Sequence, residues 1–185
     1  MTSSAAAAPP LPRENVWDYP RPPALEPVPQ RLRVVWTSAK GEETILADSK
    51  ASYRVLETSH PPTYYIPPSD VKTSLLQRSS KSSFCEWKGR ATYFDLSPPS
   101  TSALATSPKK VASRIWTYET PTDRFIPIKN YLSFYASAAT RAGEGGWKCF
   151  VGEEQVEAQD GDFYGGWKTS NLEGRMKGGK GTMGW

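Results

Sequence analysis

From residue 31 onward, apolar residues tend to occupy alternate positions, which is the pattern of a strand with one buried face. Leu32, Val34 and Trp36 form the first such run, and Gly41 separates it from a second run at residues 44–47, so together they predict a hairpin. No long segment has the period of a helix. The chain is therefore predicted to be mainly β, with little helix. Further strands are predicted at residues 50–57, 85–94, 111–118, 131–135 and 147–151.

The run at residues 85–94 has the clearest alternation. As one strand, it would place Cys85 and Trp87 on one face and Glu86 and Lys88 on the other. A cysteine in an apolar row is more often a small core residue than a nucleophile, and both roles remain open for Cys85. Glu86 and Lys88 fit either a solvated ion pair or the polar wall of a cleft.

Prolines restrict residues 63–66, because a proline pair flanks this short β-prone run on each side. Proline cannot donate to a sheet, so we expect an edge strand or a fixed extended loop. Ser69 and Asp70 are predicted to cap one helical turn that leads to Leu75. Residues 97–110 are rich in Ser, Pro and Ala and predict a surface loop.

A length of 185 residues suits one domain with a hydrophobic core. Residues 1–14 are predicted to form a disordered tail, because the Ala- and Pro-rich start has little to bury. Residues 15–185 then form a single domain with a proline-rich N-terminal arm and a glycine-rich C-terminal tail. The arm is predicted to lie extended and to dock Trp17 and Tyr19 on the domain. The tail from Gly174 is expected to wrap loosely.

The net charge of +4 allows an anionic ligand, but acidic and basic residues are interspersed, which disfavours nucleic-acid binding. The chain has neither a secretory signal pattern nor an apolar run long enough to span a membrane, so a cytoplasmic protein is predicted. One histidine and two isolated cysteines cannot assemble a closed tetrahedral zinc site from nitrogen and sulfur ligands. We expect no metal and no cofactor, and either a monomer or a homodimer.

Three sequence motifs resemble those of a known family. Residues 55–67 (VLETSHPPTYYIP), 84–89 (FCEWKG) and 163–167 (FYGGW) closely resemble domain-of-unknown-function family 427. The resemblance runs from about Asn15 to Trp185 and implies a small antiparallel fold of the β-tent type, similar to methionine sulfoxide reductase B and the ligand-binding domain of cereblon. Many β-tent proteins carry two zinc-binding CxxC knuckles. This chain has no CxxC, so that feature does not carry over.

The same family has been labelled nucleotidyltransferase-like. That chemistry needs carboxylates that hold divalent metals near a glycine-rich phosphate turn. The nearest match is Gly145-Gly146, followed by Asp160-Gly161-Asp162, and the second segment fits a hairpin turn better. We treat nucleotidyltransferase activity as the weakest alternative.

His60 is the single histidine of the chain, and it lies in a loop stiffened by Pro61 and Pro62. Its ordinary pKa of about 6.5 suits a general base or a ligand donor. A structural role, as a hydrogen-bonded loop residue, is the alternative. Glu57 precedes His60 by three positions and is predicted to orient its ring, while Lys88 would attract an acidic ligand group. We therefore predict a catalytic set of His60, Glu57, Glu86 and Lys88.

Aromatic residues make up 12% of the chain, and several of them adjoin prolines or glycines. The Tyr164-Gly165-Gly166-Trp167 segment is predicted to form a turn that presents two rings and exposes backbone N–H groups. The alternative is that these rings pack the core and the arm. The predicted ligand-binding residues are Tyr64, Tyr65, Cys85, Tyr118, Tyr164, Gly165, Gly166 and Trp167, with Trp116, Tyr131 and Tyr135 as further surplus rings.

Two classes of function follow. The first is a small-molecule site with catalytic potential, in a cleft formed by the His60 loop, the Glu86/Lys88 strand and the Tyr164–Trp167 turn. The second is a non-catalytic module that binds a peptide or a modified residue in an aromatic cage. A catalytic site needs titratable groups that converge in one cleft, whereas a cage needs three or more rings without a nucleophile.

Overall fold

A computed structural model describes residues 9–99, 110–141, 143–182 and 184. The fold is mainly β, as predicted, and its described helices are four short 3-10 turns. The strands are β1 (Glu14–Asn15), β2 (Ala24–Val28), β3 (Leu32–Ser38), β4 (Glu43–Ser49), β5 (Ser52–Leu56), β6 (Thr63–Tyr65), β7 (Leu76–Cys85), β8 (Gly89–Leu96), β9 (Val111–Tyr118), β10 (Ser133–Phe134), β11 (Ser137–Ala139), β12 (Gly145–Val151), β13 (Glu154–Gln155), β14 (Glu157–Ala158), β15 (Trp167–Lys168) and β16 (Leu172–Glu173); the 3-10 turns are η1 (Val16–Asp18), η2 (Pro68–Asp70), η3 (Thr73–Leu75) and η4 (Asp123–Ile128).

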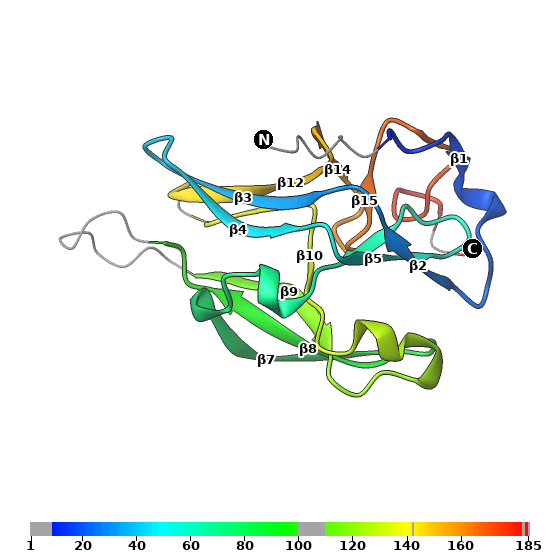
Figure 1. The fold of residues 1–185 in the computed structure, drawn as a ribbon, viewed down its shortest axis with the longest axis horizontal. Coiled ribbons are helices and arrows are strands. Elements are labelled where there is room, and N and C mark those ends of the chain that lie inside the picture. The colour runs from blue at the N-terminus through cyan, green and yellow to red at the C-terminus, as the bar shows by residue number, and fades with distance from the viewer. Residues whose placement is uncertain (1–8, 100–109, 142, 183, 185) are drawn as a thin grey trace, which may run out of the picture.

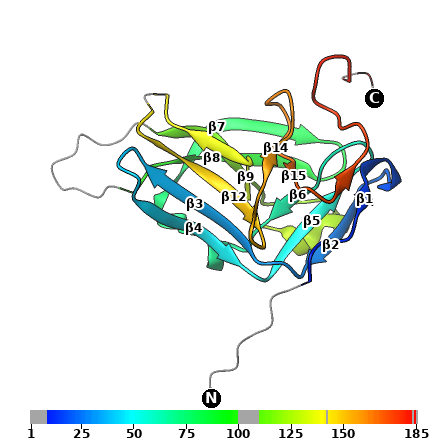
Figure 2. The same cartoon turned by 90° about the horizontal axis from the view of Figure 1, so that it is seen from above.

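Two antiparallel sheets form the body of the molecule. One has the strand order β11-β12-β3-β4, and the other has the order β10-β9-β8-β7. Figure 1 shows β3, β4 and β12 in one layer and β7, β8 and β9 in a second layer, with β2 and β5 at one end. A third sheet, of order β2-β5-β6, forms that end, and Figure 2 shows it beside the two layers from above.

The main core fills the space between the layers with large aromatic side chains. Trp36, Trp147 and Trp167 are buried to 1% exposure or less. The indole nitrogens of Trp147 and Trp167 donate to the carbonyl oxygens of Tyr135 and Phe134, at 2.9 and 2.8 Å. Because their polar ends are satisfied, these rings can be buried without an unpaired donor.

The predicted hairpin of β3 and β4 is confirmed, since Trp36 lies opposite Thr44. The short run with flanking prolines is also confirmed as an edge strand, β6, which pairs with β5 alone in its sheet. By contrast, the predicted helix cap is wrong. Ser69 and Asp70 lie inside η2, Pro67 occupies the N-cap position, and no side chain caps this turn.

The prediction of one continuous strand over residues 85–94 is wrong. The chain turns at residues 86–88, and Cys85 pairs with Gly89 across a hairpin of β7 and β8. Gly89 has a φ of +98°, a conformation that favours glycine. β7 itself was not predicted, because this Ser-rich edge strand is solvated on both faces and shows no alternation.

The N-terminal arm is a strand rather than a polyproline segment, because β2 pairs with β5 over five residue pairs. Tyr19 packs on the domain as predicted, at 8% exposure, whereas Trp17 is 45% exposed and Val16 takes the fully buried position. Residues 1–8 of the predicted tail lie outside the described residues. Glu14, at the end of that predicted tail, pairs with Leu172 in a parallel bridge between β1 and β16.

The C-terminal segment packs closely on the domain instead of wrapping loosely. The backbone N–H of Lys177 donates to the Ser59 carbonyl at 2.8 Å, and the Gln159 side chain donates to the Lys177 carbonyl at 2.8 Å. A Cβ on Gly161 would lie 2.0 Å from the Gly178 carbonyl oxygen, so the two glycines permit this contact. Most of the predicted loop at residues 97–110, namely 100–109, lies outside the described residues.

Candidate functional site

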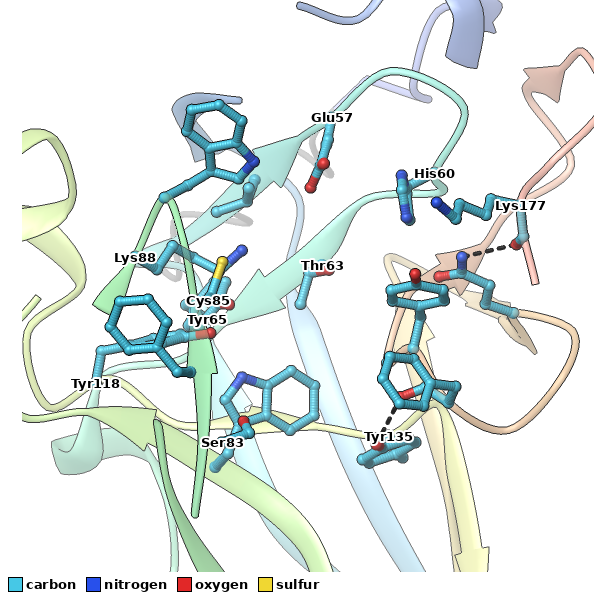
Figure 3. Close-up of a pocket in the computed structure, with 18 of the residues that line it drawn as sticks. Glu57, His60, Thr63, Tyr65, Ser83, Cys85, Lys88, Tyr118, Tyr135 and Lys177 are labelled. Atoms are coloured by element: carbon cyan, nitrogen blue, oxygen red, sulfur yellow. Dashed lines mark hydrogen bonds between the residues drawn. The ribbon is translucent and has the colours of Figure 1, made fainter. Parts of the chain in front are cut away.

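A cavity of about 690 Å³ lies between the face of the β7–β8–β9 sheet and the strands β5 and β6. The segment from Gln159 to Gly165 and Lys177 forms its remaining side. Figure 3 shows two groups of side chains facing each other across the cavity: Tyr65, Cys85, Lys88 and Tyr118 on one side, and His60 and Lys177 on the other. The first of these groups is called the inner subsite below.

The loop that carries His60 is held by segments far away in the sequence. Ser59 is buried and has a φ of 67°, in the left-handed region that non-glycine residues seldom adopt. Its N–H donates to the Val16 carbonyl at 2.9 Å, and its carbonyl accepts from the Lys177 N–H at 2.8 Å. Thr58 Oγ1 donates to the Tyr19 carbonyl. Both ends of the chain therefore fix the backbone that carries His60.

His60 is 8% exposed, and its tautomer follows from one contact. Nδ1 lies 3.0 Å from the Thr58 carbonyl oxygen, which can only accept, so Nδ1 carries the proton of the neutral ring and Nε2 carries a lone pair. Burial lowers the pKa of His60, and Lys177 and Arg21 act in the same direction against the Thr58 carbonyl and Glu57. The ring is therefore a neutral proton acceptor at neutral pH.

Glu57 does not orient the His60 ring, contrary to the prediction; the Thr58 carbonyl does so. The Glu57 carboxylate instead pairs with Arg21 at 3.2 Å. Both side chains line the cavity near its opening, and they are partly exposed. Glu57 thus contributes charge to the cavity wall, but in the described structure its carboxylate forms no hydrogen bond with the imidazole.

Lys88 lies in the β7–β8 turn, and its side chain is directed into the cavity. It is 8% exposed, and its Nζ lies 5.9 Å from the ring centres of both Tyr118 and Phe125. Among the described residues, no carboxylate forms a salt bridge with it. Burial opposes the charge, but Tyr65, Cys85 and Glu57 outweigh it and raise the pKa of Lys88, which is therefore an ammonium ion at neutral pH.

The inner subsite also holds an unpaired hydroxyl group. Tyr65 is fully buried, and its hydroxyl has no hydrogen-bond partner among the described residues. Burial raises the pKa values of Tyr65 and Tyr118, so both side chains remain protonated hydroxyls at neutral pH. A buried hydroxyl without a partner costs free energy, on the order of 1–3 kcal/mol, unless a ligand or water satisfies it.

Three rings form a continuous aromatic wall along the sheet face: Tyr93, Trp116 and Tyr135. The ring centres of Tyr93 and Trp116 lie 6.4 Å apart, and those of Trp116 and Tyr135 lie 5.3 Å apart. Cations cover the two ends, because Lys81 lies 4.3 Å from the Tyr93 ring centre and Arg114 lies 4.6 Å from that of Tyr135. The ring planes are inclined by 35° between Tyr93 and Trp116 and by 71° between Trp116 and Tyr135, so the wall offers an apolar surface of tilted rings inside the cavity.

The glycine pair of the predicted turn is required by close packing. A Cβ on Gly165 would lie 2.1 Å from Trp116 Cη2, and one on Gly166 would lie 2.4 Å from Gln159 Oε1 and 2.8 Å from the Pro61 carbonyl oxygen. Gly165 and Tyr164 line the cavity, and the Tyr164 ring contacts the His60 ring edge-on at 4.8 Å between centres.

Tyr64, Gly166 and Trp167 are not among the residues that line the cavity. Tyr64 and Trp167 are both buried in the core, and their ring centres lie 4.9 Å apart. Strand alternation explains this, because Tyr65 and its neighbour Tyr64 point to opposite faces of β6. Of the remaining predicted residues, Glu86 is exposed at the mouth of the cavity.

Several lining residues were missed by sequence reasoning. Some of them, such as Phe84 and Phe163, belong to the motifs that carry the family resemblance, but nothing local indicates that they face His60 or Lys88. At the mouth, Phe84 and Phe163 are 75% and 68% exposed. The other lining residues that were not predicted for the site are Arg21, Val55, Pro61, Thr63, Lys81, Ser83, Trp87, Tyr93, Gln159, Asp162 and Lys177.

The Asp160-Gly161-Asp162 segment is a turn, with φ values of 84° at Gly161 and 55° at Asp162. Lys168 pairs with Asp160 at 3.0 Å, and Arg114 pairs with Asp162 at 2.6 Å. In the part of the chain that the structure describes, no three His, Cys, Asp or Glu side chains gather as a metal site would need. Within those same residues, no helix has the length and apolar character that a membrane crossing requires.

A family comparison matches residues 24–144 to the family described as domain of unknown function (DUF427). The chain belongs to this family. The match covers the half of the site that carries Glu57, His60, Cys85 and Lys88, whereas the wall from Gln159 to Lys177 lies beyond it. No curated protein matches the chain significantly.

Proposed function

We propose that this DUF427 protein binds a small organic acid in the cavity, with the acidic group on Lys88 and Tyr65, and that His60 accepts a proton or hydrogen bond from the bound molecule. The observation that carries the proposal is the inner subsite. It combines a buried ammonium group and a buried hydroxyl, and within the described part of the chain the first lacks a salt bridge and the second lacks a hydrogen-bond partner. A carboxylate supplies the negative charge and the acceptor that these two groups lack.

The cavity size and the aromatic wall support a ligand with a flat apolar body. A volume of about 690 Å³ lies within the range of about 300–1,000 Å³ that is usual for pockets that hold small molecules. Trp116 offers a ring surface on which such a body can stack, whereas Lys81 and Arg114 each lie over one face of Tyr93 and Tyr135. An aromatic acid therefore fits both the charge and the shape of the site.

His60 gives the site its catalytic potential. Its Nε2 lone pair is the free acceptor of a buried neutral imidazole, while the Thr58 carbonyl fixes the ring through Nδ1. A neutral imidazole held in one orientation is the arrangement that a general base requires. The proton to be removed would be an N–H or O–H proton on the part of the ligand remote from Lys88, because Figure 3 places His60 across the cavity.

The alternative of a cage for a cationic modified residue fits the charges less well. Lys81 and Arg114 already contact the faces of Tyr93 and Tyr135, and Lys88 lies in the same cavity. A cationic ligand would meet like charges there. Nucleotidyltransfer likewise lacks support, because Asp160 and Asp162 are each paired with a separate basic residue.

The binding proposal can be tested by thermal shift and calorimetry with benzoate and with benzamide, its neutral isostere. We expect benzoate or substituted benzoates to stabilise the protein, by about 2.7 kcal/mol at a hundred times Kd. Lys88→Met should abolish the effect, while Lys40→Met, at an exposed site in the turn between β3 and β4 that does not line the cavity, should retain it. Equal responses to benzoate and benzamide, or an unchanged response in Lys88→Met, would refute the anion site.

The role of His60 requires a separate comparison. A hydroxyl or amino substituent on the acid should increase affinity in the wild type by donating to Nε2, and His60→Ala should remove that gain without removing binding of benzoate itself. A hydrogen bond of this kind contributes about 0.5–1.5 kcal/mol. If no substituted acid loses its advantage in His60→Ala, His60 does not face the ligand.

A further inference from the structure

The inner subsite contains a thiol whose environment differs from that of the second cysteine. Cys85 ends β7, is partly exposed and lines the cavity. Cys149 is fully buried, donates to the Tyr135 carbonyl at 3.6 Å, and its pKa is raised well above the ordinary value by burial. Cys149 is therefore an inert core thiol, and it provides an internal control for the reactivity of Cys85.

Two neighbours of Cys85 point to a ligand. Figure 3 shows the sulfur of Cys85 beside the Nζ of Lys88 and the hydroxyl of Tyr65. Lys88 is a buried cation, and the Tyr65 hydroxyl is fully buried without a partner among the described residues. A molecule whose carboxylate satisfied these two groups would have its adjacent carbon atoms next to the thiol.

We propose that Cys85 is a nucleophile toward bound organic acids that carry an electrophilic carbon close to the carboxylate, with α,β-unsaturated acids as the substrate class. This inference rests on the proposed anion site at Lys88 and Tyr65. The sulfur of Cys85 forms a bond to the β-carbon, and the π electrons of the double bond move to the α-carbon. That carbon takes up the proton that the thiol has lost. The addition is balanced and needs no oxidant, reductant or further reactant.

Lys88 acts on this step through the bound acid. It binds the carboxylate and so holds the electrophile within reach of the sulfur, which replaces a bimolecular encounter by reaction within a complex. Tyr65, which stays protonated, donates to the same carboxylate.

The experiment compares alkylation by iodoacetate, which carries a carboxylate, with alkylation by iodoacetamide, its neutral isostere. The rate at each cysteine is measured by peptide mass spectrometry in the native protein and in the urea-unfolded chain. In the native protein we expect the iodoacetate-to-iodoacetamide rate ratio at Cys85 to exceed that of the unfolded chain by about tenfold, which corresponds to about 1.4 kcal/mol. Cys149 should remain unmodified until the protein unfolds.

Variants separate charge from folding. Lys88→Met should return the ratio at Cys85 to its unfolded value, and Lys88→Arg, which keeps the charge, should preserve part of the preference. Acrylate should add its full mass to Cys85 in the wild type and not to Cys85→Ser. A native ratio equal to the unfolded ratio, or the absence of an acrylate adduct on Cys85, would overturn the inference.

Benzoate binding to Cys85→Ser distinguishes the two proposals. Benzoate cannot react with a thiol, so its stabilising effect reports the anion site alone. If Cys85→Ser binds benzoate and wild-type Cys85 shows no preference for iodoacetate, the nucleophile assignment is wrong and the anion site stands. If benzoate binding and the alkylation preference are both absent, both proposals are wrong.

Discussion

The Glu14→Ala substitution would remove the ionic contact that attaches the N-terminal arm. The Glu14 carboxylate accepts two hydrogen bonds from the Arg54 guanidinium, each at 2.9 Å, and a third from the Tyr19 hydroxyl at 2.5 Å. The side chains of Glu14 and Arg54 are 14% and 12% exposed. Glu26 is a second partner of Arg54, at 3.1 Å, but is itself about half exposed.

The expected loss follows from this burial. Removing one member of a buried pair costs about 3–5 kcal/mol, because it leaves the other charge uncompensated. The remaining contact with Glu26 and the partial exposure of the site reduce the expected loss to about 2–4 kcal/mol. Arg54 cannot avoid the cost by losing its proton, because a guanidinium group stays protonated in proteins.

Urea unfolding of Glu14→Ala and of Glu173→Ala tests this estimate. Glu173 forms an ion pair with Arg13 at 2.7 Å, but the side chains of Arg13 and Glu173 are 86% and 51% exposed, so its loss should cost less than about 1 kcal/mol. A loss in Glu14→Ala no larger than that in the control would show that the buried pair does not stabilise the fold.

The same substitution should affect the candidate site. The carbonyls of Val16 and Tyr19 accept hydrogen bonds from the segment that carries His60. The single histidine allows its ring to be followed by proton NMR without assignment. In Glu14→Ala the pKa of His60 should move toward about 6.5, because a loosened loop admits water. An unchanged His60 titration would show that the arm does not position this residue.

Three further predictions concern the site and its supports. The pKa of His60 is lowered in the folded state, so the unfolded state binds the proton more tightly. The free energy of unfolding of the wild type minus that of His60→Gln should therefore be constant above about pH 6.5 and decrease as the pH falls through that value. Urea unfolding at a series of pH values measures this difference. Gly165→Ala places a Cβ 2.1 Å from Trp116 and should cost about 1–3 kcal/mol and weaken benzoate binding, whereas Gly179→Ala, with its nearest contact at 3.6 Å, should be tolerated in both assays. Ser59→Val should destabilise the protein by about 1–3 kcal/mol, because a β-branched residue fits a φ of 67° poorly. Ser59→Gly should remain as stable as the wild type within about 1 kcal/mol, and thermal unfolding measures both variants.

Local pattern was sufficient for most strands, because a strand with one buried face shows its alternation in the sequence. The hairpin of β3 and β4 and the strand β9 were predictable in this way. The pattern failed at residues 85–94, where Trp87 and Lys88 continue the alternation but occupy a turn. Alternation reports only which side of the chain is apolar, and it does not report where the chain reverses.

Part of the candidate site was also visible in the sequence. Four residues from motifs of unusual composition line one cavity, namely His60, Cys85, Lys88 and Tyr164. Sequence reasoning misplaced Tyr64 and Trp167, because an aromatic beside glycine or proline fits a rim and a core equally well until the partner surface is known. In the structure the Tyr64 and Trp167 rings pack against each other inside the core.

The sequence by itself determined the strand-rich architecture, the family and the chemical groups available for a site. The tertiary structure alone decided which of these groups face one another. The Thr58 carbonyl orients His60 in place of Glu57, and distant Lys177 joins the cavity wall. The reason is physical: alternation and turn chemistry act over a few residues, whereas burial, charge and hydrogen-bond partners depend on which distant segments come into contact.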